Sequence, residues 1–304
     1  MKTLTNSLKI STAIATLAFT TIFIGCSAVN NEVESLTDDD IAIAAEVIAE
    51  SMSDDNSGVM NSLYDAVSTV DNSGISYGSQ SHQKAGPENS RSGRGQERNF
   101  TYSYDSATGI HTTEYNRNVI TDVFTKSVSV VNTHLFLTPE NEFVEFPKVD
   151  YATIESVDYT SNRNGSSTAP NRTSEFARAD SFFISGLHSS SSTLAIEGTH
   201  ESTGSTSGTF KNGTEASRNF DINFELTNVS IVKDSLLIFG NLEQGVTGTI
   251  TYSMNITRTL GEESDVKEIS GEIELVGDGT ALLKFKKIAK VIRFNLTNGT
   301  TEEE

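Results

Sequence analysis

The sequence predicts a mainly β fold: a large curved antiparallel meander sheet of half-barrel or sandwich-like form, preceded by two short N-terminal helices. Residues 249–257 alternate strictly between small polar and large apolar side chains, which is typical of a strand with one wet and one buried face. Further alternating runs occupy residues 220–226, 269–275 and 292–296. The turns at 261–264 and 277–279 are too short for parallel crossovers, so the strands that they join must be antiparallel.

Two helices are predicted within residues 36–70, where they would pack on the sheet. Thr37 is suited to an N-cap, and Asp40 lies three residues later, at the capping-box position. An apolar stripe follows at helical spacing, formed by Ile41, Ala44, Ile48 and Met52. A second short helix is predicted from Val59 to Val70. Both stripes are interpreted as contacts with the β body.

Polar segments flank the β body. Residues 71–98 are rich in Gly, Ser, Asn and Gln, and this composition predicts a flexible polar linker. The antiparallel β domain is then expected over residues 99–297. Residues 298–304 are predicted to form an acidic tail.

Within the β domain, two places depart from simple alternation. The apolar phase shifts along residues 119–137, so a bulge is expected near Asn132 if these residues form a single strand. Residues 161–174 and 189–192 consist mainly of Ser, Asn and Thr and are interpreted as polar loops.

Composition and charge limit the classes of partner. The 304 residues carry a formal net charge of −19, and 16 Phe and 8 Tyr can contribute to a substantial core. An acidic chain repels the phosphate groups of nucleic acids and anionic lipid head groups. We therefore expect no nucleic-acid partner.

Residues 1–25 have the pattern of a signal peptide. Lys2 and Lys9 give a positive start, and an apolar run extends over residues 10–24. This run is shorter than the ~20 residues of a membrane-spanning helix, so a permanent transmembrane helix is not expected. Cys26, the only cysteine, follows directly. A single cysteine can form neither an internal disulfide nor a Cys-based zinc site.

The segment Phe23-Ile24-Gly25-Cys26 resembles the lipobox of bacterial lipoproteins, in which a small residue precedes a cysteine that is lipidated and becomes the mature N-terminus; Phe23 stands where Leu is usual. The resemblance implies that Cys26 carries acyl chains such as palmitate and that residues 26–35 tether the protein to a lipid bilayer. Each buried methylene contributes about 0.8 kcal/mol, so several chains would hold the protein firmly. Ser27 follows the cysteine where inner-membrane retention would call for Asp, which favours the outer membrane on an undetermined face.

Several motifs suggest chemistry but lack its context. Gly74-Ile75-Ser76-Tyr77-Gly78 matches the nucleophile elbow of hydrolases, yet that elbow requires a strand before it and a helix after it. Ser81-His82-Gln83-Lys84 matches Ser-x-x-Lys, but it lies in the predicted linker without the companion motifs. Asp54-Asp55-Asn56-Ser57-Gly58 offers oxygen donors for calcium, but the Glu and Gly positions of an EF-hand loop are not matched.

The histidines do not form a recognisable metal site. No pair stands at metal-ligand spacing, and His111 and Glu114 would point to opposite faces of a strand. The five are His82, His111, His134, His188 and His200. We therefore predict no catalytic, cofactor-binding or metal-binding residue and no cofactor, which leaves the lipidation site at Cys26 as the one predicted site.

These observations together predict a membrane-anchored bacterial envelope lipoprotein that acts as a non-enzymatic binding or structural module of unknown ligand. In outline, the expected sheet resembles the open half-barrels of periplasmic lipoprotein carriers, an analogy at the level of the fold. The alternative is an envelope hydrolase whose active-site residues are dispersed along the sequence. An apolar cavity would favour ligand carriage, whereas converging polar groups with perturbed pKa values would favour catalysis.

Overall fold

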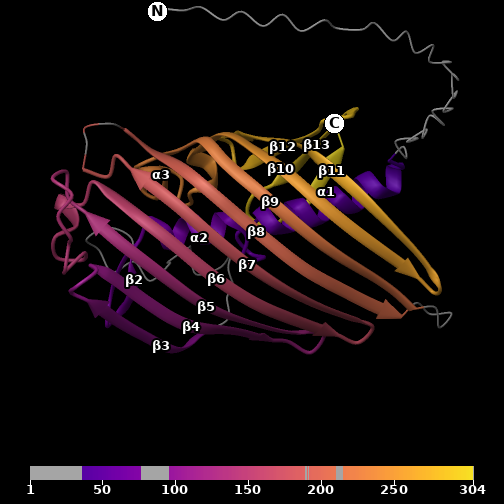
Figure 1. The fold of residues 1–304 in the computed structure, drawn as a ribbon, viewed down its shortest axis with the longest axis horizontal. Helices are drawn as coiled ribbons and strands as arrows, with labels where there is room; N and C mark the ends of the chain where they lie inside the picture. Colours follow the sequence, from indigo (N-terminus) through magenta and orange to yellow (C-terminus); the bar gives the residue numbers. More distant parts are fainter. Residues whose placement is uncertain (1–35, 77–95, 189, 191, 210–214, 304) are drawn as a thin grey trace, which may run out of the picture. The chain divides into compact units, whose positions relative to one another are not determined.

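The computed structural model describes residues 36–76, 96–188, 190, 192–209 and 215–303. A single 12-stranded antiparallel sheet dominates this part of the chain, and each strand pairs with its neighbours in sequence (Figure 1). The strands are β3 Gln96–Asp105, β4 Ile110–Ile120, β5 Thr125–Leu137, β6 Ser156–Ala169, β7 Arg172–Ser185, β8 Thr193–Thr209, β9 Glu215–Val232, β10 Val246–Leu260, β11 Glu263–Val276, β12 Thr280–Phe285, β13 Ile288–Asn295 and β14 Thr301–Glu303. The predicted meander is confirmed. The sheet is open, with β3 and β14 as its two edges.

Two helices lie against one side of the sheet, which we call the inner face (Figure 1). Helix α1 spans Asp38–Met52 and begins with the predicted capping box, in which Thr37 and Asp40 exchange hydrogen bonds. Helix α2 spans Val59–Ala66. Short helical turns α3 Ser235–Ile238, η1 Tyr151–Thr153 and η2 Glu243–Gly245 lie in the connections between strands.

The second helix ends earlier than predicted, because the chain after it turns into a hairpin. Strand β1, Thr69–Asp71, pairs with β2, Gly74–Ser76, so Val70 belongs to a strand. The Asp71 carboxylate accepts a hydrogen bond from the Ser73 backbone N–H and fixes the tight turn. The predicted linker is therefore ordered at its start, and its last residues belong to β3; residues 77–95 lie outside the described residues.

The hydrophobic core fills the space between the two helices and the inner face. Alternate residues of each long strand point inward, as Val157 and Tyr159 do on β6, while Asp158 and Thr160 between them are exposed on the outer face. The stripe predicted for the first helix is buried as expected: Ile41, Ala44, Ile48 and Met52 all belong to the core. Burial of this apolar surface on one side of the sheet makes the other side the wet one.

Complementary charge also holds the helices in place. Every charged residue of 36–76 is acidic, and the inner face supplies the cations. Arg258 binds Asp39 and Asp40 at 2.6 and 3.1 Å, and Arg218 binds Glu46 at 3.0 Å. The arginine of each pair is partly exposed to solvent, so each pair contributes modestly to stability, on the order of 1 kcal/mol or less.

Two expectations for the β domain need correction. Residues 119–137 do not form a single strand, because β4 ends at Ile120 and β5 begins at Thr125, so the condition for a bulge is not met. Strand β5 pairs with β4 and β6 in unbroken register through Asn132. The apolar pattern breaks because two inward-facing residues, Asn132 and His134, are polar. Residues 161–174 form the ends of β6 and β7 and the turn between them. Here too polar side chains occupy inward positions, which hides the strand pattern in the sequence.

The acidic tail also differs from expectation. Its residues Thr301–Glu303 form β14, which pairs with β13 through Phe294, Arg293 and Ile292. The polar loop predicted at 189–192 lies in the connection between β7 and β8, where residues 189 and 191 are outside the described residues.

Candidate functional site

Cys26, the predicted lipidation site, lies outside the described residues, as does His82. Within the described part of the chain, no helix is long and apolar enough to cross a bilayer. The same part holds no group of three His, Cys, Asp or Glu residues that could bind a metal ion. Three of the predicted histidines are buried: His111 and His134 are direct cross-strand partners on β4 and β5, and His200 lies on β8.

Sequence reasoning missed a buried group of charges on the inner face, which we call the charge cluster: Asp65, Arg163, Asp180 and His200. Arg163 on β6 donates through Nη2 to Asp65 Oδ2 of α2 and through Nη1 to Asp180 Oδ2 of β7, both at 2.8 Å. His200 Nδ1 on β8 lies 2.6 Å from Asp180 Oδ1. The side chains of Arg163, Asp180 and His200 have no exposed area, and that of Asp65 has 2%.

Neutral side chains also bind Asp65, and a second cation, Arg117, lies 3.9 Å from its Oδ1. Its Oδ2 accepts hydrogen bonds from Tyr115 Oη at 2.6 Å and from Asn132 Nδ2 at 3.3 Å. The Asn132 side-chain oxygen in turn accepts from Tyr159 Oη and Ser161 Oγ, at 3.1 and 2.7 Å. Asn132 and Arg163 are therefore partners of one carboxylate on α2, and His134 Nε2 lies 3.0 Å from the backbone carbonyl oxygen of the same residue, Asp65.

Electrostatics keep these groups in defined protonation states. Burial opposes ionisation of Asp180, but the contacts with His200 and Arg163 outweigh it and hold the pKa of that carboxyl below its ordinary value. Burial raises the pKa of Tyr115 and of Tyr159, so both hydroxyls remain donors. Burial lowers the pKa of His134 to about 4, so this ring is neutral near pH 7.

The geometry of the charge cluster does not match that of a nucleophilic site. Ser62 Oγ on α2 donates to Asp180 Oδ2 at 2.5 Å and accepts from Arg163 Nη1. In a Ser-His-Asp triad the hydroxyl would donate to the histidine instead. Here Asp180 contacts both Ser62 and His200. Helix α2 covers the charge cluster. The charge cluster is therefore suited to holding α2 on the sheet.

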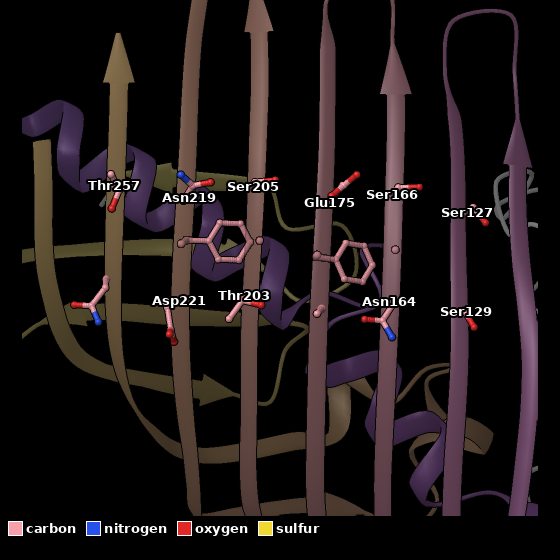
Figure 2. A pocket seen from close by; sticks show the side chains of 16 residues that line it. Ser127, Ser129, Asn164, Ser166, Glu175, Thr203, Ser205, Asn219, Asp221 and Thr257 are labelled. Carbon is pink, nitrogen blue, oxygen red and sulfur yellow. The ribbon is translucent and has the colours of Figure 1, made fainter. Parts of the chain in front are cut away.

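The outer face carries an accessible hollow of about 810 Å³, which we call the trough. Its side chains project from six neighbouring strands, β5 to β10 (Figure 2). Strand register aligns them in two rows, because the residues of each row are direct cross-strand partners. The first row is Ser127, Ser166, Glu175, Ser205, Asn219 and Thr257; the second row is Ser129, Asn164, Ala177, Thr203, Asp221 and Asn255.

The two rows consist mainly of polar side chains, and the trough carries no positive charge; Phe176 and Phe220 also belong to its lining. Its side chains offer hydroxyl, carboxamide and carboxylate groups, and Glu175 and Asp221 are its two anions. No described lining residue is Lys, Arg or His. Ala177 lies between Asn164 and Thr203 in the second row, so a small side chain sits among longer ones (Figure 2 labels these two neighbours).

Two glycines lie between the rows, and each is covered by an aromatic ring. Gly165 and Gly204 would direct a Cβ inward, where it would lie 2.3 Å from Cζ of Phe176 and of Phe220, respectively. The aromatic rings therefore cover both glycines on the inner side. The outer polar rows continue past these positions without interruption, since β6, β7, β8 and β9 keep their register there.

The sequence contains signals for the charge cluster and for the trough, but neither signal can be interpreted without the structure. Arg163, Asp180 and His200 follow the same two-residue period as buried apolar residues of their strands, such as Tyr159 and Phe182. The rows of the trough depend on register between strands, which alternation within one strand does not give.

Comparison with known proteins finds no matching family model, no matching curated protein and no matching solved structure. The inferences that follow therefore depend on the residues and geometry of this chain.

Proposed function

We propose that this protein is a lipid-anchored component of the bacterial cell envelope that acts as a non-enzymatic binding module, with the trough as its binding surface. The outer membrane is the proposed location, with Cys26 as the acylated residue. The proposal joins two separate features, an anchor at the N-terminus and a binding surface on the sheet, and each can be tested by itself.

The observation that carries the binding half is the separation of the charge cluster from the trough. The charge cluster lies between α2 and the inner face, where each of its carboxylates already has several partners. The accessible hollow lies on the opposite face and presents neutral hydrogen-bonding groups with two carboxylates. A surface of this kind can bind a ligand through many hydrogen bonds, and no buried reactive group lies within it.

The anchoring half is supported by the residues around Cys26. A lysine-containing start, an apolar run too short for a permanent span and a Gly-Cys pair follow one another. The net charge of −19 makes electrostatic attachment of the body to anionic lipids unfavourable. Attachment to a bilayer would therefore depend on acyl chains at Cys26.

Fractionation of cells that express the full chain tests the anchor. We expect wild-type protein in the membrane fraction after a high-salt wash, and Cys26→Ala in the soluble fraction. Ser27→Ala is the matched control, because it changes the next residue and keeps the thiol. Membrane association of Cys26→Ala at the wild-type level would contradict the proposal, as would an unmodified Cys26 in the mass spectrum of the wild-type protein.

A further inference from the structure

We infer that the trough binds an uncharged glycan that lies across the strands, along the two rows of polar side chains. This inference rests on the proposed function of the trough as a binding surface and adds the chemical class of its ligand. Four properties of the trough support it: the chemistry of its side chains, their spacing, their rigidity and their charge.

The side chains of the trough match the hydrogen-bonding needs of sugar hydroxyls. A sugar hydroxyl both donates and accepts, so it is best bound by groups that do the same or by paired donors and acceptors. The carboxamides of Asn164, Asn219 and Asn255 offer both roles, and the carboxylates of Glu175 and Asp221 each accept from two hydroxyls.

The arrangement of the rows favours a chain of several sugar units over a single small molecule. Six strands at a spacing of about 4.8 Å give each row a length of roughly 24 Å. The rows are two residues apart along the strands, which corresponds to about 7 Å. Five of the six strands therefore repeat a pair of polar groups, and β7 contributes Glu175 and Ala177; such a repeat suits a ligand with a repeating unit.

The positions of these groups are fixed before any ligand binds. All twelve residues of the two rows lie on strands whose register is continuous across this region. Binding groups on paired strands are held more accurately than groups on loops, so less conformational entropy is lost on binding. This matters for an open trough, where each hydrogen bond competes with water.

Charge and composition distinguish a glycan from other polymers. The two carboxylates and the absence of cations among the described lining residues disfavour nucleic acids and acidic polysaccharides. A protein partner would call for aromatic or large apolar side chains that project from the surface, whereas Phe176 and Phe220, the two aromatic residues of the lining, occupy inward-facing positions of their strands. An uncharged polyhydroxylated polymer is the class that fits both constraints.

Calorimetric titration of detergent-solubilised full-length protein tests the inference. The probes are cellohexaose, laminarihexaose, chitohexaose and dextran, with polygalacturonate as the polyanionic comparison. The trough variant is Asn219→Ala/Asp221→Ala, which removes one side chain from each row. The matched control is Asn223→Ala/Glu225→Ala, because it removes an amide and a carboxylate from the same face of β9, outside the trough.

We expect at least one uncharged probe to bind the wild type, with an affinity about tenfold weaker in the trough variant and within about twofold in the control. Far-UV circular dichroism of both variants should match the wild type, since all four substituted residues are exposed. Binding that the two double variants weaken equally would overturn the inference, and so would equal binding of polygalacturonate.

The outcomes also separate this inference from the proposed function. If Cys26→Ala leaves the membrane but no uncharged probe binds at millimolar concentration, the glycan assignment is wrong and the anchor stands. A protein ligand that loses affinity in the trough variant would likewise overturn the glycan and keep the binding surface. If Cys26→Ala stays in the membrane while a glycan binds through the trough, the anchor is wrong and the ligand assignment stands.

Discussion

Replacement of Arg163 by Met should be among the most destabilising substitutions in this protein. Arg163 is fully buried and bridges α2 to the sheet through Asp65 and Asp180. It also donates to Tyr159 Oη at 3.0 Å and to Ser62 Oγ. Methionine fills a similar volume without a charge, so the substitution leaves two carboxylates buried without their shared cation.

The expected cost follows from that uncompensated charge. Removal of one partner from a buried ion pair typically lowers the free energy of unfolding by about 3–5 kcal/mol. Asp65 keeps its bonds from Tyr115 and Asn132 and its ion pair with Arg117 at 3.9 Å. Asp180 keeps His200 and Ser62, so we expect a loss of roughly 3–4 kcal/mol at pH 7, at the lower end of that range.

Urea unfolding followed by far-UV circular dichroism measures this loss, because the chain contains no tryptophan for fluorescence. Arg172→Met is the matched control: Arg172 lies on β7 and is exposed, so its replacement should change the free energy of unfolding by less than about 0.5 kcal/mol. The double variant Arg163→Met/Asp180→Asn should be more stable than the sum of the single effects predicts, by about 1 kcal/mol or more.

The pH dependence of the loss gives a second check. In the wild type, His200 and Arg163 hold the pKa of Asp180 below its ordinary value, so the stabilisation from this carboxylate is lost as the pH falls below about 4. Without Arg163, the folded carboxyl takes up a proton more readily, and the deficit of the variant should shrink as the pH is lowered. A cost below about 1 kcal/mol at pH 7, or a deficit that grows in acid, would refute this account of the charge cluster.

Three further predictions concern the helix cap, a glycine and a histidine. Thr37→Ala removes the acceptor for the Asp40 N–H and should cost about 1 kcal/mol in urea unfolding; no change would mean that the cap does not stabilise α1. Gly198→Ala places a Cβ 2.0 Å from the Ser181 carbonyl oxygen at a φ of +149°, so it should cost several kcal/mol, whereas Gly240→Ala, at a φ of +77° in open space, should cost about 1 kcal/mol; equal losses would contradict this. His134 has a pKa of about 4 when folded and about 6.5 when unfolded, so the unfolded state binds the extra proton and wild-type stability should fall by about 2 kcal/mol from pH 7 to pH 5; an unchanged slope in His134→Gln would exclude this residue as the cause.

Local sequence patterns were sufficient for the fold class and for the first helix. The period of two in residues 249–257 reflects a property of each strand by itself, a wet side and a buried side, and β10 has it as predicted. The capping box at Thr37 and Asp40 likewise involves residues three positions apart, and the structure contains both of its hydrogen bonds. Strand alternation and a helix cap depend on residues that are close together in the sequence. Both can therefore be predicted without knowledge of contacts with distant segments.

The predictions that failed concern residues whose environment comes from distant parts of the chain. Asn132 looks misplaced in a strand until Asp65, on a helix 67 residues earlier, accepts its hydrogen bond. Arg163 belongs at a buried position only because two carboxylates meet it there. A polar residue is costly to bury unless its partners are present, and a single stretch of sequence does not say whether they are.

The two parts of the proposed function differ in the same respect: the anchor depends on contiguous residues, and the binding surface depends on residues that are distant in the sequence. The sequence by itself predicts the lipidation of Cys26, because an apolar run and the residues next to the thiol are contiguous. The trough exists only in the tertiary structure. Glu175 and Asn219 come to lie in the same row through the pairing of three strands, β7, β8 and β9. Register is set by contacts between strands, so it places exposed polar residues side by side in an order that no one segment contains.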